Sequence, residues 1–180
     1  GSEMCIRDSS VTIHLREDRR HINENDLRQI KSKLNIPLNL EIAATNEMLN
    51  IALKSKPPFI CIVPEKRKEI TTEGGLNLKY KKSYLKKLIK KLKKNKSRVS
   101  LFIEPSIKDI LISKEFNADC VEIHTGKFSN LVNKNKDYKK EFKRIKNAVI
   151  LGNKLGLEVH AGHGLTYRSA KILSKIPGIK

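Results

Sequence analysis

Three polar stretches of the sequence carry side chains that bind phosphate or move protons, and each stretch directly follows a short apolar run. They are residues 14–21 (HLREDRRH), 65–76 (EKRKEITTEGGL) and 161–167 (AGHGLTY). In a parallel α/β barrel, several strands deliver polar side chains from their carboxyl ends into one catalytic site. The three stretches together therefore favour an enzyme, although the basic composition is also typical of a nucleic-acid binder.

The first stretch places Arg16, Arg19, Arg20 and His21 close together in the sequence. A guanidinium group binds a phosphate through paired hydrogen bonds, so this loop is a candidate phosphate clamp. The alternative is a solvated loop in which the acidic residues between the arginines neutralise them. The motif by itself does not decide between these two interpretations.

The second stretch contains Thr-Thr-Glu-Gly-Gly at residues 71–75. Hydroxyl groups and glycine amides together form cradles for oxyanions. The alternative is an ordinary Gly-Gly turn, which is the more frequent meaning of such a pair in isolation. The stretch matches neither a Walker A loop nor a dinucleotide-binding fingerprint.

Two carboxylates and a histidine are the candidates for proton transfer. Glu41 and Glu122 occupy polar positions of strand-like segments, where burial and neighbours set the pKa of a carboxyl group. His163 lies between two glycines just past a strand, which suits an exposed catalytic histidine. The alternative is a metal site formed by His124, His160 and His163 with Glu122, but the sequence has neither the H-x-H nor the H-E-x-x-H spacing.

Six short apolar segments alternate with helical patterns, and this order predicts a parallel α/β sheet in a single domain. The expected strands are residues 11–15, 38–43, 59–64, 99–104, 120–125 and 157–162. The expected helices cover residues 26–34, the segment after a Thr45 cap, residues 79–96, the segment after a Ser106 cap, and residues 138–155. Six strands allow either an open sheet or an incomplete barrel.

Alternation within the strands favours the barrel. In four of the expected strands one side is apolar. The opposite side carries Thr12 and His14 in the first strand, Asn39 and Glu41 in the second, Ser100, Phe102 and Glu104 in the fourth, and Cys120, Glu122 and His124 in the fifth. An open sheet covered by helices has two apolar faces, whereas in a barrel the polar side points to a shared interior. Because a buried carboxylate is costly without a partner or a task, these groups indicate a site in the interior.

The net charge of +19 would attract nucleic acid or an anionic membrane. Ten lysines and no acidic residue lie in residues 79–96, where Leu85, Leu88, Ile89 and Leu92 form one apolar stripe. We expect a helix that packs on the core and exposes a lysine face. A basic RNA-binding protein remains the alternative, although the segment has few aromatic residues to stack on bases.

The three cysteines form no C-x-x-C pair, which favours a reducing, cytoplasmic setting. No apolar run approaches the ~20 residues of a membrane span, and no signal peptide is visible. Residues 1–10 begin with Gly-Ser and show no periodicity, so we expect a tag or non-native leader there and one domain over residues 11–180.

Six blocks, in order along residues 11–180, resemble the pyridoxine 5'-phosphate synthase family of deoxyxylulose-dependent vitamin B6 biosynthesis. The blocks are TIHLREDRRHI (12–22), LNLEIAATNEML (38–49), VPEKRKEITTEGGL (63–76), VSLFIE (99–104), VEIHTG (121–126) and AGHGLTY (161–167). The resemblance implies a (β/α)8 TIM barrel with extra helices. It also implies condensation of 1-deoxy-D-xylulose 5-phosphate with 3-amino-2-oxopropyl phosphate to pyridoxine 5'-phosphate, inorganic phosphate and water.

The same resemblance implies roles for individual residues. His14 and Glu41 would accept protons, His163 would donate a proton, and Glu122 would stabilise the transition state. The phosphate contacts would be Arg16, His21 and Thr71 for the deoxyxylulose phosphate, and Gly164 for the amino ketone. The resemblance further implies acid/base catalysis without a cofactor or a metal, and a homo-octamer.

The chain departs from the family pattern in two respects. His160 stands where the family has an asparagine. A first strand with an Asn-x-Asp-His pattern and a last strand with a Gly-His pair are not found, so we expect an incomplete barrel with about strands two to seven of eight. Since such a barrel has open edges, we expect the 180-residue chain to bind deoxyxylulose phosphate weakly and to turn over no substrate.

Overall fold

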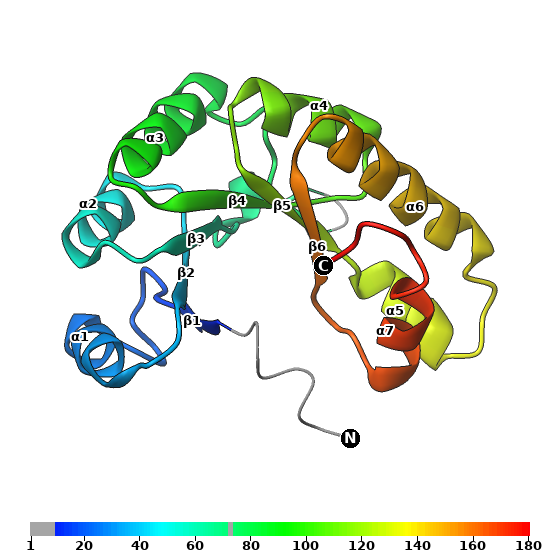
Figure 1. The fold of residues 1–180 in the computed structure, drawn as a ribbon, viewed down its shortest axis with the longest axis horizontal. Coiled ribbons are helices and arrows are strands. Elements are labelled where there is room, and N and C mark those ends of the chain that lie inside the picture. Colours follow the sequence, from blue (N-terminus) through cyan, green and yellow to red (C-terminus); the bar gives the residue numbers. More distant parts are fainter. Residues whose placement is uncertain (1–9, 72–73) are drawn as a thin grey trace.

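A computed structural model of the chain describes residues 10–71 and 74–180. Six parallel strands form one sheet in the order β1-β2-β3-β4-β5-β6, which is also their order in the sequence (Figure 1). The strands are β1 (Val11–His14), β2 (Leu38–Ile42), β3 (Phe59–Ile62), β4 (Arg98–Ile103), β5 (Cys120–His124) and β6 (Glu158–Gly162). All six expected strands are confirmed; the expected leader lies outside the described residues except for Ser10.

Helices connect the strands and lie on one side of the sheet. The expected ones are α1 (Glu24–Lys33), α2 (Asn46–Ser55), α3 (Lys82–Lys94), α4 (Ile107–Glu115) and α6 (Lys139–Lys154). Two short helices and a 3-10 turn were not predicted: α5 (Gly126–Asn133), α7 (Tyr167–Leu173) and η2 (Arg67–Glu69). Figure 1 shows the strands curving into a half-barrel with the helices on its outside.

Local capping signals fix several helix ends as the sequence predicted. The Thr45 hydroxyl accepts a hydrogen bond from the Met48 amide at 3.3 Å, and the Ser106 hydroxyl accepts one from the Asp109 amide at 3.4 Å. Gly156 follows α6 with a φ of +75°, which a residue with a Cβ rarely adopts. These caps set helix ends close to the adjoining strands: Thr45 lies three residues after β2, and Gly156 lies two residues before β6.

The core lies between the outer face of the sheet and the helices. Leu38, Leu40 and Ile42 of β2 are fully or almost fully buried, whereas Asn39 and Glu41 between them are only partly buried. The same alternation recurs in β4. The polar residues therefore face the hollow of the half-barrel, and the prediction of a barrel-type interior over an open two-faced sheet is confirmed.

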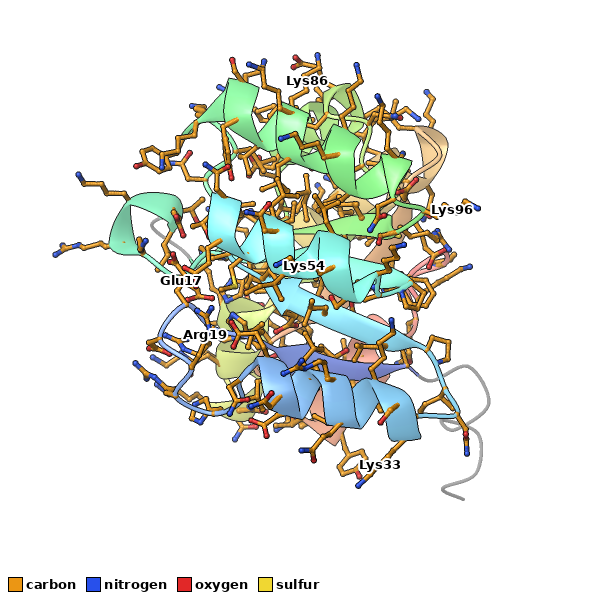
Figure 2. All side chains as sticks on the ribbon, turned by 90° about the vertical axis from the view of Figure 1, so that its left-hand side faces the viewer. Glu17, Arg19, Lys33, Lys54, Lys86 and Lys96 are labelled. Atoms are coloured by element: carbon orange, nitrogen blue, oxygen red, sulfur yellow. The ribbon has the colours of Figure 1, made fainter. Side chains whose placement is uncertain are left out.

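Helix α3 matches the predicted amphipathic pattern. Its apolar stripe, Leu85, Leu88, Ile89 and Leu92, is buried against the sheet. Its lysines lie on the outer surface of the molecule, where Figure 2 shows Lys86 at the periphery. Acidic residues of the neighbouring α4 region pair with some of them, as in the contact of Lys82 Nζ with Glu115 at 2.8 Å. Within the described residues, no helix is long and apolar enough to cross a membrane.

The strand register sets the polar interior in rows. His14 lies opposite Glu41, and Glu41 lies opposite Cys61. Glu122 belongs to the next inward-facing row toward the carboxyl ends of the strands, and there it lies opposite both Phe102 and His160. Side chains from neighbouring strands are thereby brought to the same height of the half-barrel.

Candidate active site

A cavity of about 500 Å³ lies at the carboxyl ends of the strands. Its lining consists of His14, Glu41, Val63, Pro64, Ile70, Gly74, Phe102, Glu122, His124 and His163. The four residues predicted to be catalytic are thus brought together, although the sequence separates them by up to 149 positions (residues 14 and 163). The location agrees with the way a parallel α/β barrel assembles a catalytic site.

The two interior carboxylates have raised pKa values. Burial raises the pKa of Glu41, and the neighbouring His14 opposes part of this effect. Burial, with the negative charge of Glu41 as a second cause, raises the pKa of Glu122 to about 7. The Cys61 thiol lies 3.8 Å from the Glu122 carboxylate and donates to it. A carboxyl group with a pKa of about 7 exchanges protons readily at neutral pH.

The position of Glu122 depends on a glycine at the end of β6. A Cβ atom placed on Gly162 would lie 2.0 Å from Oε1 of Glu122, far inside van der Waals contact. The Gly162 carbonyl also accepts hydrogen bonds from the amide and the hydroxyl of Thr125, at 2.9 and 2.7 Å. The glycine therefore lets β6 come close to the carboxylate while the two strand ends remain tied together.

His14 is held between two carboxylates. Its Nε2 lies 2.9 Å from Oε1 of Glu65, and its Nδ1 lies 3.8 Å from Oε2 of Glu41. The Glu65 side chain is only 5% exposed and also accepts a hydrogen bond from the Glu17 amide at 3.0 Å. Glu65 was not among the predicted site residues, because nothing in its local motif distinguishes it from the charged residues around it.

The aromatic rings of Phe102, His124 and His163 pack together in the lining of the cavity. The His124 and His163 ring centroids are 4.7 Å apart, and Phe102 meets both rings, at 5.3 Å from His124 and 6.1 Å from His163. Burial, together with the nearby His124, lowers the pKa of His163. The backbone of His163 has a φ of +74°, and the Thr125 hydroxyl lies 2.9 Å from its carbonyl oxygen.

Glu104 joins the threonine-glycine turn to the rest of the site. Its Oε1 accepts hydrogen bonds from the Gly75 amide at 2.7 Å and from the Thr71 hydroxyl at 3.2 Å, and it lies 3.4 Å from Nδ1 of His124. The Gly74 amide donates to the Thr71 hydroxyl at 3.2 Å. Both glycine amides and the threonine hydroxyl are therefore engaged within the protein, and the phosphate contact of Thr71 stays a prediction. Residues 72–73 of the motif lie outside the described residues.

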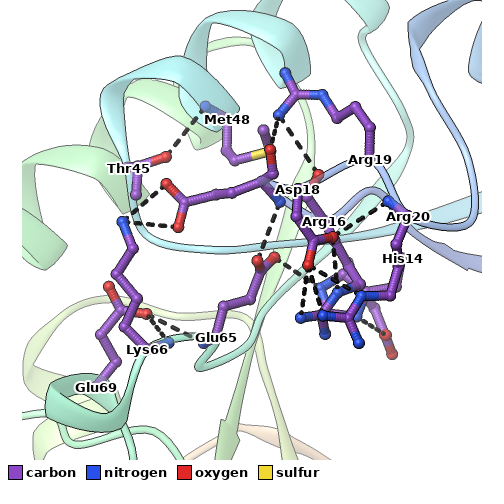
Figure 3. A network of polar contacts seen from close by, with 12 residues as sticks. His14, Arg16, Asp18, Arg19, Arg20, Thr45, Met48, Glu65, Lys66 and Glu69 are labelled. Carbon is purple, nitrogen blue, oxygen red and sulfur yellow. Dashed lines mark hydrogen bonds and ion pairs between the residues drawn. The ribbon is translucent and has the colours of Figure 1, made fainter.

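The arginine loop is neutralised by acidic partners, as its second interpretation anticipated. Asp18 accepts hydrogen bonds from Arg16 at 3.2 Å and from Arg20 at 3.0 Å. Arg19 pairs with Glu24 at 2.7 Å and also contacts Glu47 of α2. A phosphate at Arg16 would have to compete with Asp18 for the guanidinium group. Figure 3 shows Asp18 with Arg16 and Arg20, beside Glu65 and His14.

The four predicted substrate contacts do not line the cavity. Arg16 and Thr71 are partly buried nearby, whereas His21 and Gly164 are exposed. Gly164 has a φ of +72° and follows His163 directly. The roles of these four residues stay predictions.

The alternative metal site of three histidines and Glu122 is not assembled. His160 bonds Oε1 of Glu158 at 2.7 Å instead. In the part of the chain that the structure describes, the one group with ligand atoms within 4.8 Å of one another is Cys120, Glu158 and His160. Arg98 contacts both Cys120 Sγ, at 3.5 Å, and Glu158, at 3.1 Å, so a positive charge already occupies the place that a cation would take.

The fold and the site define an enzyme built on a parallel α/β barrel, with acid/base side chains at the carboxyl ends of its strands. Residues 6–180 match the family model described as pyridoxal phosphate biosynthesis protein PdxJ. The chain is 59% identical over 170 residues to the pyridoxine 5'-phosphate synthase of Pelagibacter ubique, and 51% identical to that of Thermodesulfovibrio yellowstonii. The chain belongs to the pyridoxine 5'-phosphate synthase family.

These two alignments cover 94% of this chain and 71% and 69% of the two relatives, so the chain spans about seven tenths of their length. Solved structures of more distant sequence share the fold. FabK from Thermotoga maritima matches with a TM-score of 0.55 at 15% identity, over 92% of this chain and 47% of FabK. The tryptophan synthase alpha-subunit of Pyrococcus furiosus matches with a TM-score of 0.54 at 10% identity, over 87% of this chain and 59% of the subunit.

Proposed function

We propose that the cavity at the carboxyl ends of the strands condenses 1-deoxy-D-xylulose 5-phosphate with 3-amino-2-oxopropyl phosphate. The products are pyridoxine 5'-phosphate, inorganic phosphate and water. The observation that carries this proposal is the convergence of four ionisable side chains, His14, Glu41, Glu122 and His163, on one cavity. The pKa values of Glu122 and Glu41 are raised and that of His163 is lowered, so burial favours the uncharged form of all three groups.

The reaction consists of proton transfers around carbon–nitrogen and carbon–carbon bond formation. The amine attacks the ketone and forms a Schiff base with loss of water, phosphate is eliminated, and the ring closes. Each step needs a base to remove a proton and an acid to return one. We assign proton acceptance to His14 and Glu41 and proton donation to His163, and we expect no cofactor or metal to take part. Glu122 stabilises the charge that develops in the transition state.

Substrate phosphates bind at the rim of the cavity in this proposal. Arg16, His21 and Thr71 hold the deoxyxylulose phosphate, and Gly164 contacts the phosphate of the amino ketone. Arg16 lies on the loop that follows His14 and β1, and its guanidinium group is the kind that binds a phosphate through paired hydrogen bonds. Holding two small substrates side by side lowers the entropic barrier to condensation. We expect the protein to act in the cytoplasm as a homo-oligomer, with the octamer as the expected state.

The test is a product assay with a matched pair of proteins. One protein is the 180-residue chain, and the other is the chain extended by the first and last strands of the Pelagibacter ubique relative. Pyridoxine 5'-phosphate and released phosphate are measured after both substrates are added, with Glu122→Gln and Glu41→Gln in each protein.

We expect turnover from the extended protein, and a fall of about 10²–10⁴-fold in each variant because a positioned acid/base group contributes that much. A fully folded extended protein without turnover would refute the proposed reaction. Equal turnover by the 180-residue chain would refute our expectation that the chain alone is inactive.

A further inference from the structure

We propose that Glu65 is a positioning residue that fixes the tautomer of His14. In this tautomer Nε2 carries the proton and Nδ1 presents a free lone pair to the cavity. The proposal deepens the proposed function, because it rests on His14 as a proton acceptor. It gives a role to Glu65, which neither the sequence motifs nor the family resemblance placed in the site.

Both oxygens of the Glu65 carboxylate are engaged by hydrogen bonds. Oε1 lies 2.9 Å from Nε2 of His14, and Oε2 accepts from the Glu17 amide at 3.0 Å. The amide can only donate, and an ionised carboxylate can only accept. Nε2 must therefore be the donor in its contact, and in a neutral imidazole the other nitrogen, Nδ1, is then unprotonated.

The free nitrogen points to the reacting groups. Nδ1 of His14 lies 3.8 Å from Oε2 of Glu41, which is too long for a hydrogen bond. His14 and Glu41 both line the cavity, whereas Glu65 does not. The imidazole thus has a protein-facing side that is bonded and a cavity-facing side that is available to a substrate proton.

The local fold holds Glu65 at this point. Glu65 follows β3, and the turn after it is closed by Glu69, whose Oε2 accepts hydrogen bonds from the amides of Glu65 and Lys66 at 3.1 and 3.2 Å. The Glu69 side chain is buried, and its carbonyl accepts a hydrogen bond from the Asn77 amide at 2.7 Å. Figure 3 shows the Glu65 carboxylate reaching from this turn to the loop after β1.

The arrangement has a chemical consequence beyond orientation. When Nδ1 takes a proton from the substrate, His14 becomes positively charged, and the adjacent carboxylate stabilises this cation. The Glu65 side chain is 5% exposed, so water screens the contact weakly. If Glu65 only joined the two loops, its hydrogen bonds would still be needed, but it would not matter which nitrogen of His14 carries the proton.

The variant Glu65→Gln separates these roles. Its amide oxygen still accepts from the Glu17 backbone, so its amino group turns to His14 and donates to Nε2. Nε2 must then be unprotonated, and the proton moves to Nδ1, where it blocks the base. Because glutamine has almost the shape of glutamate, the fold is retained. Glu17→Gln is the matched control: it removes a charge from the same loop, its side chain pairs with Lys66, and it does not contact His14.

Two measurements are made on the chain and on its extended form. ¹⁵N NMR of histidine-labelled protein reports which nitrogen of His14 carries the proton, and it needs no turnover. We expect a protonated Nε2 in the wild type and in Glu17→Gln, and a protonated Nδ1 in Glu65→Gln. In the extended protein we expect kcat of Glu65→Gln to fall by about 10²–10⁴-fold with KM changed by less than about threefold, and Glu17→Gln to keep its activity.

The outcomes distinguish the two proposals. A wild-type His14 with the proton on Nδ1, or the same tautomer in wild type and Glu65→Gln, would overturn the positioning role. The expected change of tautomer with an unchanged kcat would show that Glu65 sets the tautomer but that His14 is not the proton acceptor, which overturns that part of the proposed function.

Discussion

Replacing Glu122 with glutamine should stabilise the protein at neutral and alkaline pH while it lowers turnover by the extended protein about 10²–10⁴-fold. The pKa of Glu122 is raised from 4.5 to about 7, mainly by burial. A raised pKa means that the folded state binds the proton more tightly than the unfolded state does. The contribution of this carboxyl group to stability is therefore fully present below pH 4.5 and is lost as the pH rises through 7.

The size of the effect follows from the shift. One pKa unit corresponds to 1.36 kcal/mol, so a shift from 4.5 to about 7 corresponds to about 3 kcal/mol at pH 8. Glu122 is partly exposed in the cavity, so relaxation and water reduce this to about 2 kcal/mol. Glutamine has no charge to lose. The free energy of unfolding of Glu122→Gln should thus equal that of the wild type near pH 4.5 and exceed it by about 2 kcal/mol at pH 8.

The assay is urea unfolding of both proteins at four pH values between 4.5 and 8. Glu115→Gln is the control, because the contact of Glu115 with Lys82 lowers the pKa of Glu115 and its replacement should give no gain at high pH. A difference between wild type and Glu122→Gln that stays constant with pH would refute the assignment of a near-neutral pKa to Glu122. It would also remove the main electrostatic support for acid/base work by this group.

Three further predictions concern the neighbours of these groups. Gly162→Ala should displace Glu122, because the new Cβ would lie 2.0 Å from Oε1, and a roughly 100-fold loss of kcat in the extended protein is expected while circular dichroism stays unchanged. Glu104→Ala should lower the free energy of unfolding by about 3–5 kcal/mol, measured in urea, because the Gly75 amide and Thr71 hydroxyl lose their acceptor. Cys61 should resist thiol reagents at pH 8 until the protein unfolds, as mass spectrometry of the labelled peptide would show, because burial raises the pKa of its thiol.

The sequence predicted the sheet well because the polar and apolar alternation of each strand is a local signal. Glu41 sits between Leu40 and Ile42, and this pattern alone places its side chain on the inner face. Helices α5 and α7 were missed because their 8 and 7 residues are too few to show a clear helical period. The strand pattern led to Glu41, Glu122 and His163 as candidates before the structure, whereas the expected role of His14 came from the family resemblance.

The contacts that hold those residues could not be predicted. Glu65 and His14 are 51 residues apart, and Glu104 and Gly75 are 29 residues apart. No local pattern pairs such residues, because their proximity depends on the strand register and on the path of the loop after β3. The pairing of Asp18 with Arg16, two residues away, is by contrast a local contact that one of the two interpretations of the arginine loop anticipated.

The groups that surround the two proposed catalytic histidines, His14 and His163, differ in a way that fits the proposed roles. His14 bonds a buried carboxylate, which stabilises the cation formed when it accepts a proton. The His163 ring packs against the rings of Phe102 and His124, and the pKa of His163 is lowered by burial and by the nearby His124. A histidine that holds its proton weakly is the stronger acid once protonated, so it gives the proton to a leaving group readily. These contacts support the proposal that His14 accepts a proton and His163 donates one, and exchanging the environments, rather than removing either ring, should reverse the proposed direction of proton flow.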